Sequence, residues 1–184
     1  VTVSEHTVHG DVTPSELGLT YVLRRSSIES TLLVDRWPQI LLTSVTDAVQ
    51  ELEMCSAAGV GTIVDAMPAA SGRDAIRLAE ISRLSGIHVV ACTGLHTSKY
   101  YEGQRWTSQE PAEVLAELFI SDVLDGIDRY DYMGPVVRRT PHRAGILKVA
   151  VLEDVPVRVD RLDETSRLAQ DDEPRGEVPG MQAP

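Results

Sequence analysis

The sequence has few aromatic residues, few cysteines and no long apolar run. Aromatic residues make up 4% of the 184 residues, although 42% of the chain is hydrophobic. No apolar stretch approaches the roughly 20 residues that span a bilayer. The N-terminus also lacks the basic start and apolar core of a signal peptide. We therefore expect a single globular domain in the cytoplasm, without a membrane-spanning segment.

Positive charge is also scarce. The 17 basic residues stand against 28 acidic ones, which gives a net charge of −11. Nucleic acids and anionic membranes would repel such a chain, so we expect neither as a partner. The two cysteines, Cys55 and Cys92, lack Cys-x-x-Cys spacing. Isolated cysteines are more often small buried hydrophobes than a disulfide or a metal-ligand pair.

The pattern that organises the chain is a strand, a helix and a second strand. Residues 60–64 form a short β-branched run, typical of a strand buried on both faces. Residues 73–85 place apolar side chains mostly on one helical stripe, and Gly86 can take the left-handed conformation that ends a helix. Residues 89–92 are apolar again. Strands joined in this way are parallel, with a right-handed crossover.

Polar side chains follow these strands. Asp65, Thr93 and His96 come where the strands run into loops, which is where sites gather in parallel α/β folds. The long loop 94–106 also carries several of the chain's few aromatic residues. Loops of this length are usually binding loops or lids.

Further elements are predicted on both sides of this unit. Residues 1–18 alternate β-formers with turn residues, which predicts a small antiparallel hairpin, and residues 19–23 favour a first core strand. Thr46 suits the N-cap of a helix that Gly59 ends.

The second half of the chain contains one more helix and one more strand. Thr107 and Glu110 resemble a capping box, and the helix should then run to Gly126. Residues 145–151 read as a buried strand that Lys148 interrupts. Residues 151–184 are acidic and rich in proline, without a helical stripe, so we predict a disordered tail.

These segments, in their order and spacing, resemble the phosphotriesterase family of metal-dependent hydrolases in the amidohydrolase superfamily. The resemblance runs from about residue 8 to residue 150. It rests on Gly10 with Leu17-Gly18-Leu19-Thr20, residues 58–65, Gly72-Arg73-Asp74, Thr93-Gly94-Leu95-His96 and residues 144–150.

The resemblance implies an α/β fold, a partial (β/α)8 TIM barrel of about four βα units after the hairpin. The family site holds two metal ions, commonly zinc, which activate a hydroxide to attack phosphotriesters, lactones or related small-molecule esters. Lys148 stands where the family has a carboxylated lysine that bridges the metals. A lysine amine that burial keeps neutral can add carbon dioxide, and the carbamate oxygens can span two metals. The alternative is a packed lysine stem whose amine reaches solvent.

Two departures from the family pattern concern the metal ligands. Leu23 and Arg25 stand where the family carries its His-x-His pair. Leucine has no donor atom, and arginine stays cationic and cannot ligate a metal. The family's other ligands are two histidines and an aspartate of later strands, and this sequence stops after the fourth strand. We therefore predict a truncated or frameshifted product that is catalytically impaired and does not retain zinc or another divalent metal.

The remaining polar residues are weighed one by one. His96, Tyr100 and Tyr101 are candidates for substrate contact, because the family lines its pocket with this loop. His88 is interpreted as a packed strand residue. Gly72-Arg73-Asp74 opens a helix whose free N–H groups could hold an anion, although a simple helix start is favoured.

The sequence thus predicts three segments: a hairpin over residues 1–18, half of a phosphotriesterase-like barrel over 19–150 and a divergent tail over 151–184. The leading hypothesis is a metal-dependent ester hydrolase by descent. The rival is a non-catalytic binding or assembly module that uses loop 94–106. Exposed barrel edges also predict self-association.

Overall fold

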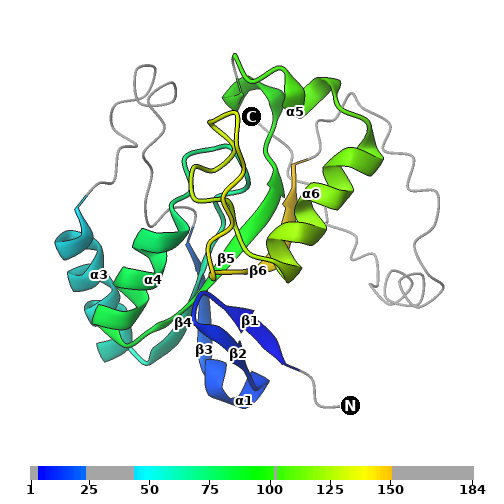
Figure 1. The fold of residues 1–184 in the computed structure, drawn as a ribbon. Coiled ribbons are helices and arrows are strands. Elements are labelled where there is room, and N and C mark those ends of the chain that lie inside the picture. The colour runs from blue at the N-terminus through cyan, green and yellow to red at the C-terminus, as the bar shows by residue number, and fades with distance from the viewer. Residues whose placement is uncertain (1–3, 24–43, 102, 151–184) are drawn as a thin grey trace, which may run out of the picture. The chain divides into compact units, whose positions relative to one another are not determined.

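The computed structural model describes residues 4–23, 44–101 and 103–150 (Figure 1). Arg25 and the predicted disordered tail lie outside the described residues. The strands are β1 Glu5–Thr7, β2 Gly10–Val12, β3 Leu19–Leu23, β4 Val60–Asp65, β5 His88–Leu95 and β6 Ala144–Val149. The helices are α1 Pro14–Leu17, α3 Val45–Ala57, α4 Ala75–Ser85, the 3-10 turn η2 Ser98–Tyr100, α5 Trp106–Gln109 and α6 Ala112–Leu124.

A four-stranded parallel sheet forms the centre of the fold, in the order β3-β4-β5-β6. In register, Leu23 lies opposite Asp65, Ile63 opposite Val89 and Gly94 opposite Lys148. Because neighbours in the sheet are also neighbours in the chain, the sheet grows in one direction, as barrel sheets do. The prediction of parallel strands near residues 19–23, 63–65, 89–93 and 146–150 is confirmed.

The predicted N-terminal hairpin is also confirmed, and it packs against the sheet. Strands β1 and β2 pair antiparallel. The N–H of Val8 at the turn donates to the carbonyl of Val89 at 2.9 Å, and the ring of His142 donates to the carbonyl of Val8 at 2.7 Å. The Val8 side chain is buried in the core beside β5. The hairpin is therefore fixed to the sheet by backbone groups.

The hydrophobic core lies between the sheet and helices α3 and α4, which run side by side in Figure 1. Ile63 and Val89 contribute from the strands, and Leu52, Leu78 and Ile81 from the helices. Apolar contacts of this kind, rather than helix propensity, hold short amphipathic helices in place. None of the described helices is long and apolar enough to cross a membrane.

Helix α4 begins and ends where the sequence indicates. The Asp74 carboxylate accepts a hydrogen bond from the Arg77 N–H at 3.0 Å, as an N-cap does. Gly86 follows the last turn in the left-handed conformation, with φ of 71°. The favoured interpretation of Gly72-Arg73-Asp74 as a helix start is confirmed.

Two predicted helix starts are wrong. The N-cap of α3 is Ser44, whose hydroxyl accepts from the Asp47 N–H at 3.1 Å, and Thr46 lies inside the helix. The capping box predicted at Thr107 does not open α6. Residues Trp106–Gln109 form a separate short helix, and α6 begins at Ala112 after an extended Glu110. The residue before a proline is pushed out of the helical region, which separates the two helices at Pro111.

Candidate active site

The candidate residues lie at the carboxyl ends of the parallel strands. Leu23 ends β3 opposite Asp65 at the end of β4. Further along the sheet, Gly94 near the end of β5 lies opposite Lys148 near the end of β6. Since all four strands are parallel, these carboxyl ends lie at the face where barrel enzymes place their active sites.

Lys148 is partly buried at this edge. Its Nζ donates to the carbonyl of Ala66, just after β4, at 3.0 Å. The pairing with β5 at this point needs a glycine, because a Cβ on Gly94 would lie 2.0 Å from the Lys148 carbonyl oxygen. Lys148 therefore holds the start of the β4–α4 loop through its amine.

His96 and Tyr100 lie together in the loop after β5. Their rings meet edge to face with centroids 4.2 Å apart. The Thr97 N–H donates to Nδ1 of His96 at 2.7 Å, so this nitrogen carries no proton in the bond. The structure thus brings together two of the three aromatic-loop residues that the sequence proposes for substrate contact.

Tyr101, the third of these residues, is only 5% exposed. Its hydroxyl accepts from the His96 N–H at 2.7 Å and donates to the Ala69 carbonyl at 3.0 Å. Burial raises the pKa of this phenol above its usual value. Tyr101 therefore fixes the loop after β5 to the loop after β4, and its hydroxyl is already engaged within the chain.

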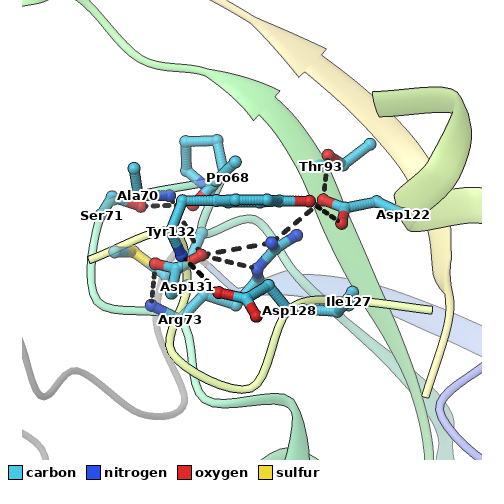
Figure 2. A network of polar contacts seen from close by, with 12 residues as sticks. Pro68, Ala70, Ser71, Arg73, Thr93, Asp122, Ile127, Asp128, Asp131 and Tyr132 are labelled. Atoms are coloured by element: carbon cyan, nitrogen blue, oxygen red, sulfur yellow. Dashed lines mark hydrogen bonds and ion pairs between the residues drawn. The ribbon is translucent and has the colours of Figure 1, made fainter. Parts of the chain in front are cut away.

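A buried polar network lies behind the β4–α4 loop, with Arg73 at its centre (Figure 2). The guanidinium is buried and has carboxylates on two sides: Nη2 lies 3.0 Å from Asp122, and Nε donates to Asp131 at 3.2 Å. Nη1 donates to the Cys92 carbonyl at 2.5 Å. A buried charge is tolerated only when it is paired and hydrogen-bonded in this way.

Asp131 closes the β4–α4 loop from the other side. Its carboxylate accepts the backbone N–H groups of Ala70 at 3.0 Å and of Gly72 and Arg73 at 2.9 Å each. Burial raises the pKa of Asp131 to about 6, although Arg73 and the three N–H donors oppose the rise. The N–H groups of this loop, which come before the N-cap Asp74, therefore bind a carboxylate of the chain itself.

Asp122 joins the network to α6 and β5. It is fully buried, and it accepts from Thr93 Oγ1 at 2.7 Å and from Arg73 on one oxygen. The other oxygen accepts from the Tyr132 hydroxyl at 2.5 Å and from Arg139 at 2.7 Å. Each oxygen of the Asp122 carboxylate thus accepts two hydrogen bonds. These bonds connect segments that lie far apart in the sequence.

Sequence reasoning missed this network. One signal was present, since Asp122 is a charged residue close to the apolar residues Phe119 and Val123 of its helix. Its partners Arg73 and Thr93 lie 49 and 29 positions away, however, so spacing alone did not connect them. A cavity of about 320 Å³ opens beside Arg73, Asp131 and Arg129.

The described residues do not fit a metal pair. No group of three or more His, Cys, Asp or Glu side chains lies together within residues 4–23, 44–101 and 103–150. Lys148 stands at the expected strand end, but its amine contacts a carbonyl, and a lysine alone does not hold a catalytic zinc. We therefore derive no reaction step through a metal.

The four parallel strands with their connecting helices have the arrangement of half a TIM barrel. The chain belongs to the phosphotriesterase family, whose model matches residues 3–152. The crystal structure of an amidohydrolase from Mycoplasma synoviae superposes with a TM-score of 0.74 at 29% identity, over 79% of this chain and 42% of that one. The predicted fold class, a partial (β/α)8 barrel, is thereby confirmed.

Curated relatives agree on the family. A phospho-furanose lactonase of Mycoplasmopsis synoviae is 30% identical over 77% of this chain and 41% of its own length. An aryldialkylphosphatase of Saccharolobus solfataricus is 26% identical, over 75% of this chain and 41% of its own length. The chain thus spans about two fifths of the length of these relatives.

Proposed function

We propose that this chain is a phosphotriesterase-family hydrolase by descent, related to enzymes that act on small-molecule esters or lactones, and that by itself it is catalytically impaired. The observation that carries the proposal is the ligand set. The chain has Lys148 at the family's lysine position, but leucine and arginine at residues 23 and 25, where the family has imidazoles. Among the described residues no other cluster of metal ligands replaces them.

Substrate contact is proposed for the loop after β5. His96 and Tyr100 present paired rings beside the strand end, and Tyr101 holds the His96 backbone in place. In this arrangement His96 and Tyr100 would touch a substrate, and Tyr101 would fix their position through its hydroxyl.

Metal content tests the proposal. We expect the 184-residue protein, loaded with zinc and then gel-filtered, to hold no more zinc than its Lys148→Ala variant, since one lysine supplies too few of the three or four ligands that zinc uses. Elemental analysis measures the ratio of zinc to protein. Close to two zinc ions per chain, lost in Lys148→Ala, would contradict the proposal and indicate a working hydrolase.

The second candidate is a non-catalytic binding module built on loop 94–106. The edge-to-face pair of His96 and Tyr100 favours it, because such a pair offers a surface for a ring or an acyl chain. A lactone or phosphotriester that binds the wild type, is not turned over and loses affinity in His96→Ala would support this candidate.

A further inference from the structure

The two outer strands of the parallel sheet expose apolar side chains. Strand β3 and strand β6 each have one neighbour within the described part of the chain. Between 52% and 62% of the surface of five apolar side chains on these strands is exposed, namely Leu19, Tyr21, Val22, Leu147 and Val149. Two opposite edges of one sheet therefore have the composition of sheet interior.

Neither β3 nor β6 has the features that prevent an edge strand from pairing with a strand of another chain. Such strands usually have charged residues or prolines. Strand β3 has no charged residue, and the single charge of β6 is Lys148, whose amine is directed back across the sheet to Ala66. The net charge of −11 thus lies elsewhere in the chain, and a strand can approach either edge without burying a charge.

Helix α6 is also incompletely covered. Val114, Ile120 and Leu124 are exposed, and Asp122 is its one fully buried side chain. Glu113 and Glu117 lie among these exposed positions, so the exposed part of α6 is mixed rather than wholly apolar. Helix α6 packs against β5 and β6.

We propose that two copies of this chain associate edge to edge and close one barrel. In this dimer, β3 of one protomer lies parallel to β6 of its partner, and the same contact occurs a second time about a two-fold axis. Two sheets of four strands supply the eight strands of a closed barrel of this class.

The lengths and directions of the two edge strands support a second copy of this chain as the partner. Strands β3 and β6 are similar in length, with five and six residues, and both run in the same direction in the sheet. A closed pair leaves no free edge, whereas any open row of copies leaves two. The inference does not depend on the metal content or the activity of the chain.

Sedimentation velocity of the 184-residue protein tests the dimer. We expect a dimer at micromolar concentration. Tyr21→Lys and Leu147→Glu each place a charge at one of the two edges, on the side of the sheet that faces the helices, and each should weaken association at least about tenfold because a charge would be desolvated there. The matched control is Leu84→Lys, which charges an exposed apolar position of α4 away from both edges and should leave the dimer intact.

Mixing the two edge variants decides the orientation. In a mixed pair, one interface joins the Tyr21→Lys edge of one protomer to the Leu147→Glu edge of its partner, so that opposite charges meet, and the other interface is wild type. We expect equimolar mixing to restore a 1:1 dimer, even if either variant fails to fold alone. A monomeric wild type, a series of larger open assemblies, a dimer indifferent to both edge charges, or a mixture that stays dissociated would each overturn the proposal.

Discussion

Arg73 connects several segments in the described part of the chain. Its guanidinium joins the β4–α4 loop to the Cys92 carbonyl, to Asp122 of α6 and to Asp131. The side chains of Arg73, Asp122 and Asp131 are all buried. Figure 2 shows the guanidinium of Arg73 between the carboxylates of Asp122 and Asp131.

Removing the Arg73 charge should strongly destabilise the fold. In Arg73→Met the buried Asp131 loses its cationic partner and Asp122 keeps only Arg139, and removing one partner of a buried pair costs about 3–5 kcal/mol. Urea unfolding followed by circular dichroism measures the change in the free energy of unfolding.

Arg143→Met is the matched control for this prediction. Arg143 pairs with Asp11, and both side chains are partly exposed to solvent. We expect its urea midpoint to stay near that of the wild type, as exposed ion pairs contribute little. A similar loss in both variants would show that the buried network has no special role.

At the scale of elements, the junction of β5 and β6 depends on one glycine. Gly94 has φ of +102°, and a Cβ there would meet the Lys148 carbonyl at 2.0 Å. Gly94→Ala should therefore cost about 2–4 kcal/mol, from overpacking together with a left-handed backbone. Thermal unfolding should show a lower midpoint for this variant.

Gly134→Ala controls for the loss of a glycine as such. No atom lies within 4 Å of a Cβ built at Gly134, so the added methyl group meets open space. We expect its thermal midpoint to be unchanged or slightly higher, because alanine restricts the unfolded chain. Equal midpoints for the two variants would contradict the close approach of β5 and β6.

The elements show what local sequence determines. Strands β4 and β5 were predictable because a β-branched or apolar run between turn residues has few other solutions, and α4 because Asp74 and Gly86 mark its ends. The start of α3 was not predictable in detail, since Ser44 and Thr46 are both good caps and local sequence does not choose between them.

The site shows what local sequence does not determine. Lys148 and the aromatic loop were located because each follows or interrupts a strand. The partners of Arg73 come from three separate segments, and only the folded chain brings them together. The same holds for Tyr101, whose hydroxyl bond to Ala69 depends on the position of the neighbouring loop.

At the scale of the whole molecule, several buried acids make stability sensitive to alkaline pH. Burial raises the pKa of the Cys92 thiol to about 11, and it also raises the pKa values of Tyr101 and Tyr132. The folded state therefore keeps protons that the unfolded chain releases. This stabilisation is complete below the unfolded thiol value near 9 and is lost as the pH rises through 11.

We expect the thermal midpoint to fall steeply between pH 9 and pH 11, within the window set by the Cys92 pKa shift. The variant Cys92→Ala lacks the buried thiol, so its midpoint should depend less on pH over this range. Tyr130→Phe removes an exposed phenol and should keep the wild-type slope. A wild-type midpoint that stays flat to pH 11 would contradict the prediction.

The carboxylate of Asp131 occupies the backbone N–H groups of the loop that precedes α4. Three N–H groups that could hold a phosphate or a sulfate instead hold an oxygen pair from the same chain. A tethered group of this kind competes at an effective concentration of about millimolar or higher. A dissolved anion must displace the Asp131 carboxylate before it can bind these N–H groups. The carboxylate thus keeps the loop in its folded conformation and competes with anions from solution.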